Sequence, residues 1–134
     1  MKNHIVIDTC VYLSYARFNK LYRISYCIAD YGLDVFIDSN LFDELKKNLP
    51  KVLFLHGYDV QAALDEIVEF TIWIETIPIY TNCPDSKDNF LFDLAIQTQS
   101  EVIVTVEKVL LDFKESPVPV HDIKWFKETY PVNL

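Results

Sequence analysis

The sequence predicts a three-layer α/β/α sandwich around a central, mostly parallel sheet of four to five short strands. Short β-branched runs at residues 4–7, 35–37 and 102–104 alternate with longer stretches whose apolar residues recur at helical spacing. Such continuous apolar strands are typical of a sheet that helices cover on both faces. With 134 residues and neither a linker nor a repeat, we expect one domain over residues 1–134.

The first half of the chain predicts two strands, each followed by helices. After the strand at 4–7, Asp8 and Thr9 are polar residues that can cap a helix, and Gly32 is a suitable helix stop. After the strand at 35–37, Asp38 or Ser39 can cap the next helix. The expected helices cover residues 11–18, 21–31, 41–48 and 59–73, with a connection over 50–58.

The second half predicts further strands and helices in alternation. A peripheral strand is expected over 75–79, because Pro78 cannot donate a hydrogen bond to a sheet ladder. Asp122 is a suitable cap for a last helix that ends near Thr129. The elements expected between them are a helix over 88–98, the strand over 102–104, a short helix near 107–113 and an edge strand over 118–120.

Composition excludes several classes of protein. With only 2 Gly, the chain has no glycine-rich loop that could cradle a nucleotide cofactor. The net charge of −8 argues against broad, charge-driven nucleic-acid binding, which needs a basic surface. The acidity can serve solubility alone, or part of it can form a carboxylate cluster that binds cations, and the two are compatible.

Cysteine usage and hydropathy indicate a reducing, cytoplasmic setting. Cys10, Cys27 and Cys83 form no CxxC motif and cannot all pair, so we expect them to be small residues in or near the core. The chain shows no signal peptide and no run of about 20 apolar residues, so no membrane association is expected.

Four acids are expected to meet at one edge of the sheet. Asp8 follows the first strand, and Glu107 follows the strand at 102–104. Asp88 opens the helix that leads into that strand, and Glu44 lies on the helix after the second strand. Open α/β sheets bind ligands at the carboxyl ends of their strands. Four carboxylates in one place repel one another unless a cation neutralises them, and Mg²⁺ or Mn²⁺ fits such oxygen ligands best.

Each acid also has a structural interpretation. Asp8 can merely cap the helix that follows it, and Asp85 and Asp88 can form a capping box. Glu44 alone would be typical of a solvated helix, and Glu107 is equally consistent with either role. We favour a functional role for Asp8 and Asp88, and a structural role for Asp85.

Two threonines and the histidines are weaker candidates. Thr9 and Thr105 lie beside candidate acids and can orient a carboxylate or a water, although both are also ordinary residues for a strand end. His4, His56 and His121 are scattered without the spacing of metal ligands, so we interpret them as structural or surface residues.

Four segments in order give the chain a family resemblance from about residue 4 to about residue 128. They read IVIDTCVYLS at the N-terminus, SNLFDEL around Glu44, CPDSKDNFLFDLAI around Asp88, and EVIVTVEKVLL around Glu107. With these segments the chain resembles the PIN domain family, in particular the toxin components of toxin–antitoxin pairs. Each motif is weak by itself, and the ordered set is fairly specific.

The resemblance implies a Mg²⁺- or Mn²⁺-dependent endoribonuclease that hydrolyses RNA phosphodiester bonds. Carried over by position, its acidic quartet is Asp8, Glu44, Asp88 and Glu107, and Thr105 matches the polar residue before the fourth acid. It also implies an antitoxin protein as partner and a homodimer, which exposed aromatic residues on the early helices can support.

The match departs from the family pattern near two of the acids. Cys10 stands where the family usually has Asn, and TGDKDL is replaced by TVEKVL, with Val106, Glu107 and Val109 at the changed positions. Glu in place of Asp moves the carboxylate by about one methylene, which is enough to disturb the geometry of a metal site.

The alternative functions follow from these departures. The chain can be a PIN-like domain with weakened catalysis that acts as a binding module. A haloacid-dehalogenase-like phosphatase is a less favoured reading, because that family needs a second Asp where this chain has Cys10. Lys46, Lys47 and Lys51 form a basic cluster after Glu44 that can contact phosphate or simply be solvated.

Overall fold

A fully parallel five-stranded sheet forms the middle layer of the molecule. The structure is a computed structural model that describes residues 3–54 and 57–133. The strand order is β3-β2-β1-β4-β5, and each neighbouring pair is parallel. The strands are β1 His4–Ile7, β2 Asp34–Ile37, β3 Ile72–Trp73, β4 Val102–Val104 and β5 Val120–His121.

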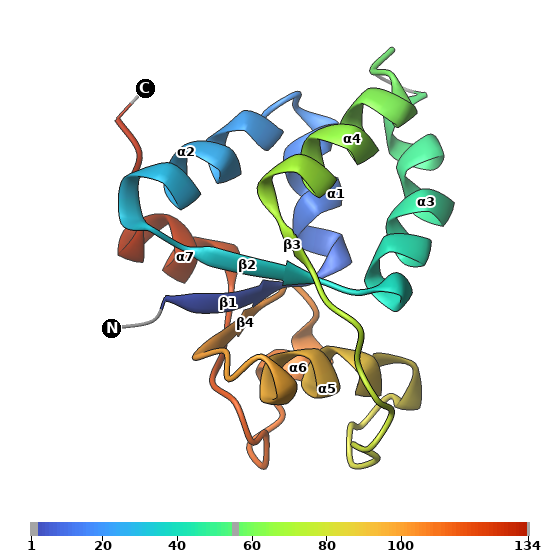
Figure 1. Cartoon of the computed structure of the whole chain (residues 1–134), viewed down its shortest axis with the longest axis vertical. Helices are drawn as coiled ribbons and strands as arrows, with labels where there is room; N and C mark the ends of the chain where they lie inside the picture. Colours follow the sequence, from blue (N-terminus) through green and yellow to red (C-terminus); the bar gives the residue numbers. More distant parts are fainter. Residues whose placement is uncertain (1–2, 55–56, 134) are drawn as a thin grey trace.

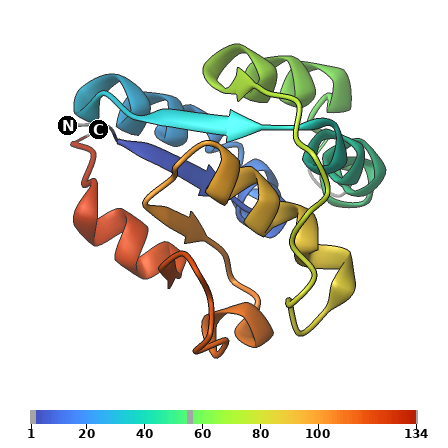
Figure 2. The ribbon, with the colours of Figure 1, turned by 60° about the horizontal axis from the view of Figure 1, so that its bottom comes forward.

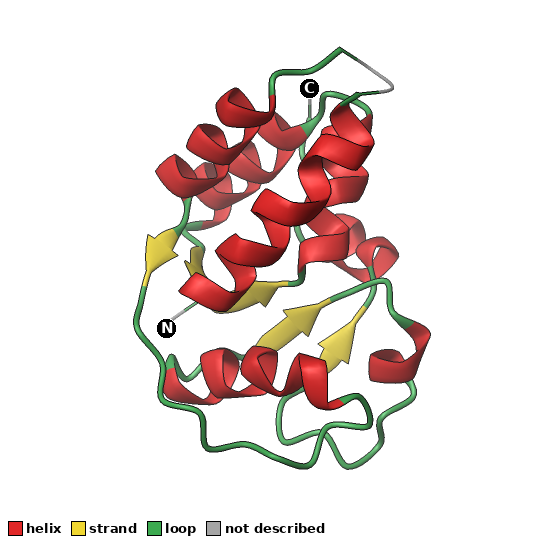
Figure 3. Cartoon of the chain, turned by 90° about the vertical axis from the view of Figure 1, so that its right-hand side faces the viewer, coloured by secondary structure: helices red, strands yellow, loops and turns green. Residues whose placement is uncertain are grey.

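Helices cover both faces of the sheet, which confirms the predicted α/β/α sandwich (Figure 3). Helices α1 to α4 cover one face, and α5 and α6 lie on the other (Figures 1 and 2). The helices are α1 Thr9–Arg17, α2 Leu21–Tyr31, α3 Ser39–Leu53, α4 Val60–Phe70, α5 Asn89–Gln97, α6 Lys108–Leu111 and α7 Ile123–Thr129, with a 3-10 turn, η1, at Ser86–Asp88. Within the described ranges, no helix is long and apolar enough to span a bilayer.

The two central strands are buried on both faces. Ile5, Ile7 and Ile103 are fully inaccessible to solvent, which explains why these strands are continuous apolar runs. Burial of each such side chain contributes about 1.5–3 kcal/mol relative to an exposed one.

The order in which the chain adds strands to the sheet switches sides between β1 and β4, while all strands stay parallel. It builds β1, β2 and β3 outward, then returns through α5 to place β4 on the other side of β1. Ile7 is in register with Val104, and the Asp8 backbone N–H donates to the Val104 carbonyl at 2.9 Å. The residues that follow β1 and β4 therefore emerge side by side at the switch point, where α/β sheets form their ligand crevice.

The strand predicted over 75–79 is wrong. The edge strand is β3, two residues that pair with Phe36 and Ile37 of β2. Backbone groups farther along bond instead to side chains of α5: Ile79 N–H donates to Asp93, and Gln97 bonds both the N–H and the carbonyl of Ile77. This segment satisfies its backbone without a partner strand.

Two helix boundaries also differ from prediction. α4 ends at Phe70 rather than near 73, because Thr71 turns extended and its hydroxyl bonds the Ile67 carbonyl at 2.7 Å. α3 runs past Pro50 to Leu53, so the predicted connection over 50–58 begins too early, and residues 55–56 lie outside the described residues. The buried Leu53 stabilises this last turn although proline donates no hydrogen bond.

Most of the predicted caps are confirmed. The side chains of Asp8, Asp38 and Asp122 accept backbone N–H groups at the starts of α1, α3 and α7, and Gly32 ends α2 with a φ of 62°. The structural role favoured for Asp85 is confirmed, because its side chain caps η1, whereas the Asp88 side chain makes no capping bond to α5. The last edge strand lies at 120–121 rather than 118–120.

Candidate functional site

Asp8 is a buried carboxylate held on both of its oxygens. Only 2% of the residue is exposed, at the point where β1 gives way to α1. Its Oδ1 accepts from the Thr9 backbone N–H at 2.7 Å. Its Oδ2 accepts from Thr105 Oγ1 at 2.8 Å and from the Cys10 thiol at 3.3 Å. These bonds fix the orientation of the carboxylate.

Thr105 joins the ends of the two central strands. The residue follows β4, is fully buried, and donates its hydroxyl hydrogen to Asp8. The same oxygen accepts the Glu107 backbone N–H at 3.1 Å. Thr105 therefore sets the position of Glu107 relative to Asp8.

Glu44 reaches the same place from α3. Its Oε1 accepts from Thr9 Oγ1 at 2.8 Å, so the second predicted threonine links Glu44 to the helix that Asp8 begins. Burial raises the pKa of Glu44, and the nearby charges of Asp88 and Asp38 add to this effect.

Asp88 and Glu107 form a hydrogen-bonded carboxyl pair. Burial raises the pKa of Asp88 to about 7, and the charge of Glu107 raises it further. Burial also raises the pKa of Glu107, and the charge of Asp8 acts in the same direction. The bond between them raises the pKa of Asp88 and opposes the rise at Glu107.

The structure thus places the four predicted acids and Thr105 in one region, where the charges of the acids act on one another. The group whose ligand atoms all lie within 4.8 Å of one another is Asp8, Cys10 and Glu107, without Glu44 or Asp88. Burial raises the pKa of Asp8 to about 6, and the charge of Asp88 contributes to that rise. In residues 3–54 and 57–133, none of the four acids takes part in a salt bridge, and the charges of Lys47 and Lys87 partly offset those of Glu44 and Asp88.

This donor set fits a divalent cation. Burial and mutual repulsion make it costly to ionise these carboxylates. A bound cation offsets that free-energy cost most strongly at such a site. Oxygen ligands suit Mg²⁺ and Mn²⁺, and one ligand atom each from Asp8, Cys10 and Glu107 lie within 4.8 Å of one another. The site is therefore chemically able to hold a metal ion.

A family profile for the PIN domain matches residues 4–108 of the chain. This chain belongs to the PIN domain family. The match spans β1 to the start of α6, and so contains all four acids.

Solved structures show the same fold. The crystal structure of VapBC2 from Rickettsia felis, bound to a DNA fragment from their promoter, contains a chain that superposes on this PIN domain with a TM-score of 0.59 and 16% identity. The superposition covers 89% of this chain and 98% of that chain. At this identity the likeness concerns the fold alone. No curated protein matches the sequence.

Cys10, predicted both as a small residue in or near the core and as a departure from the family pattern, lies in the site of this PIN domain. It is half-buried, and its sulfur accepts the Val106 backbone N–H at 3.5 Å besides bonding Asp8. Burial raises the pKa of the Cys10 thiol to about 12, so the thiol stays protonated near neutrality. The signal was its place in the first helical turn after Asp8. Cys27 and Cys83 are buried, as expected.

Two further buried acids of this PIN domain have a structural role. Asp38 ends β2 and is 1% exposed, but its oxygens are bonded by the Leu41 N–H and the Thr76 hydroxyl. Asp93 is 4% exposed and holds the backbone of Ile79 and Tyr80. Neither carboxylate is free to join the quartet.

Proposed function

We propose that this PIN domain is a Mg²⁺- or Mn²⁺-dependent endoribonuclease that hydrolyses RNA phosphodiester bonds. The observation that carries the proposal is the meeting of four carboxylates, from four separate segments, whose pKa values burial and mutual charge all raise. Such a cluster favours a bound cation over an empty state. A surface group of solvated acids would have no such preference.

The proposed roles follow the hydrogen bonds. Asp8, Glu44, Asp88 and Glu107 would hold the ion, which when bound activates water and neutralises charge on the leaving oxygen. Thr105 acts as a positioning residue, since it fixes Asp8 and Glu107 through one oxygen. Cation binding would displace protons from Asp88 and Glu107, whose pKa values are raised.

We further propose that the domain is the toxin of a cytoplasmic toxin–antitoxin pair. The family membership and the fold likeness to a chain of the VapBC2 structure support this assignment. An antitoxin protein would then be its partner. Tyr22 and Tyr26, exposed at 41% and 48% on α2, support a homodimer through the early helices.

A binding module with weakened catalysis is the second candidate. It is favoured by Val106 and Val109, which flank Glu107, are each 46% exposed and replace a glycine and an acid of the family pattern. Their side chains add apolar surface where a polar substrate would approach.

A Mn²⁺ titration by calorimetry, with RNA cleavage assayed in parallel, tests the proposal on wild type, Asp8→Asn and Asp85→Asn. Asp85 is a charge-matched control because its side chain accepts the Lys87 N–H of η1 and its charge raises the pKa of Asp88, so Asp85→Asn removes a nearby negative charge without removing a proposed ligand. Binding and cleavage that are lost in Asp8→Asn and kept in Asp85→Asn support a metal nuclease. Binding without cleavage in wild type favours the binding module. No Mn²⁺ binding in wild type refutes both the metal site and the nuclease.

A further inference from the structure

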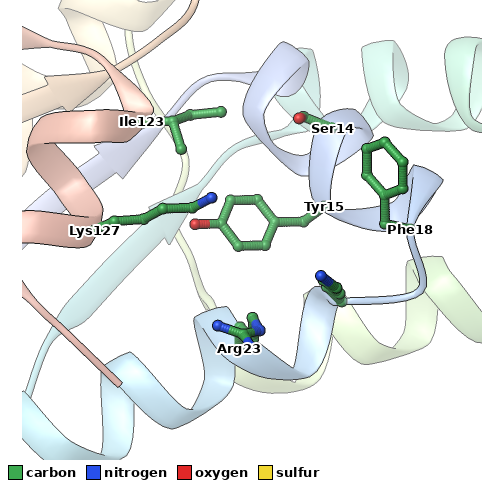
Figure 4. A pocket seen from close by; sticks show the side chains of 7 residues that line it. Ser14, Tyr15, Phe18, Arg23, Ile123 and Lys127 are labelled. Atoms are coloured by element: carbon green, nitrogen blue, oxygen red, sulfur yellow. The ribbon is translucent and has the colours of Figure 1, made fainter. Parts of the chain in front are cut away.

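A basic pocket lies apart from the acid cluster, between the end of α1, the start of α2 and the side of α7. Its volume is about 350 Å³, and Figure 4 shows the Tyr15 side chain crossing it toward Lys127, with Arg23 on the α2 side. The residues that line it are Ser14, Tyr15, Phe18, Lys20, Arg23, Ile123 and Lys127. A second cavity of about 180 Å³ adjoins it and shares Tyr15, Arg23 and Lys127.

The pocket concentrates positive charge in an acidic protein. Lys20, Arg23 and Lys127 line it, no carboxylate does, and the whole chain carries a net charge of −8. Within the described residues none of these three cations forms a salt bridge. Three uncompensated cations around one cavity repel one another, so an anion bound there would relieve that repulsion.

The buried groups of the pocket also point to an anionic ligand. The Arg23 Nε is buried and has no hydrogen-bond partner among the residues described, which is costly, so an anion that drew the guanidinium into the pocket would relieve that cost. Burial raises the pKa of Tyr15 to about 12, so its hydroxyl remains a hydrogen-bond donor. The Lys127 amine lies 5.9 Å from the centre of the Tyr15 ring. Donors of this kind suit the oxygens of a phosphate.

One stripe of α1 connects the pocket with the acid cluster. Cys10 and Ser14 are four residues apart on the same side of α1, and Phe18, four residues farther on, directly follows the end of the helix. Cys10 bonds Asp8 in the acid cluster, whereas Ser14 and Phe18 line the pocket. At a rise of about 1.5 Å per residue, the stripe extends roughly 12 Å.

We propose that this pocket binds a backbone phosphate of the RNA strand, a few nucleotides from the bond at the acid cluster. The proposal rests on the proposed nuclease function and adds a positioning site to it. Phe18 is 61% exposed at the pocket mouth, and an aromatic ring among cations suits a nucleotide, whose base can stack while its phosphate is bound. The shared stripe of α1 favours a strand that continues from the acid cluster over an acidic peptide that would need the pocket alone.

The test is the binding of a short, fluorescently labelled single-stranded RNA, followed by anisotropy in EDTA so that no cleavage occurs. The variants are Arg23→Gln, Lys127→Gln and their double variant. The matched control is Lys124→Gln with Lys114→Gln, which removes the same charge from exposed positions outside the pocket. We expect the pocket double variant to bind about tenfold more weakly and with a shallower salt dependence, and the control to bind within about twofold of wild type.

Cleavage kinetics add a second readout. The pocket variants should raise KM with kcat near the wild-type value, because they leave the acid cluster intact. Thermal unfolding checks that the variants fold, and Lys127→Gln alone suffices if Arg23→Gln does not, because Lys127 is exposed.

The outcomes separate this proposal from the nuclease proposal. If the folded pocket variants bind RNA as tightly as the control, the pocket proposal is overturned. It is also overturned if they lose affinity for a polyglutamate peptide and keep it for RNA, since the pocket would then serve a protein partner. If wild type fails to cleave RNA with Mn²⁺ but the pocket variants still weaken RNA binding, the phosphate site stands and the nuclease function fails.

Discussion

The Thr105 hydroxyl donates to Asp8 Oδ2 at 2.8 Å and so ties the end of β4 to the end of β1. The two residues are 97 positions apart in the sequence, and the bond is buried. The hydrogen bond favours the charged form of Asp8 and therefore lowers the pKa that burial raises. One neutral side chain thus adjusts both the position and the charge of the central acid.

Replacement of this hydroxyl should weaken the site. In Thr105→Val, Asp8 and the Glu107 N–H each lose a buried partner, so we expect a loss of about 1–3 kcal/mol in the free energy of unfolding. Mn²⁺ affinity should fall as well, because Asp8 holds its proton more tightly. Urea unfolding and calorimetry measure both effects, with Thr81→Val at an exposed position as control. An unchanged Mn²⁺ affinity would contradict the positioning role.

The metal-free protein should lose stability as the pH rises. Burial raises the pKa of Asp8 from 3.8 to about 6 and that of Asp88 to about 7, so the folded state holds protons that the unfolded state releases. This contribution is complete below about pH 4 and is lost as the pH rises through 6 and 7. For Asp8 it amounts to about 3 kcal/mol.

Urea unfolding in EDTA at pH 5 and pH 8 measures this difference. Asp8→Asn should show a smaller loss between the two values, because it removes the Asp8 part of the change. Excess Mn²⁺ should stabilise wild type more at pH 8 than at pH 5, since protons compete with the cation. A wild-type stability that rises with pH by more than that of Asp8→Asn would contradict the proposed protonation of Asp8.

Cys10 should shift the metal preference of the site. Its sulfur lies with oxygens of Asp8 and Glu107 within 4.8 Å, and a soft donor there favours Zn²⁺ over Mn²⁺. In Cys10→Asn we expect the ratio of Zn²⁺ to Mn²⁺ affinity to fall about tenfold or more, with Cys27→Ala as the cysteine control, because the Cys27 thiol bonds the Tyr130 carbonyl instead of an acid of the site. Competition titrations measure the ratio, and an equal ratio in all three proteins would show that the sulfur makes no contact with the ion.

Replacement of Asp93 should lower the stability of the protein without changing its Mn²⁺ affinity. Its carboxylate accepts the backbone N–H groups of Ile79 and Tyr80 and so holds the segment that was predicted to be a strand. Asp93→Ala leaves these groups without a partner, and we expect a loss of about 3 kcal/mol in the free energy of unfolding. The Mn²⁺ affinity of the folded variant should equal that of wild type. A large drop in affinity would mean that the loop supports the quartet.

The order of the layers and the positions of the acids along the chain can be predicted from sequence pattern. Continuous β-branched runs identify strands buried on both faces, and parallel strands deliver the residues after them to one edge. For this reason Asp8 and Glu107 could be expected together before any geometry was known. The edge strand could not, because two residues of β3 carry too little periodic pattern to be distinguished from the end of α4.

The hydrogen-bond partners and the protonation of the site residues follow from the tertiary fold. Contacts such as Thr105 with Asp8 and Thr9 with Glu44 join residues that are distant in sequence, so no local spacing encodes them. The same holds for the raised pKa values of Asp88 and Glu107, which depend first on how deeply both are buried. Sequence pattern thus predicts which residues reach the edge of the sheet, whereas burial and distance decide their charge and their partners.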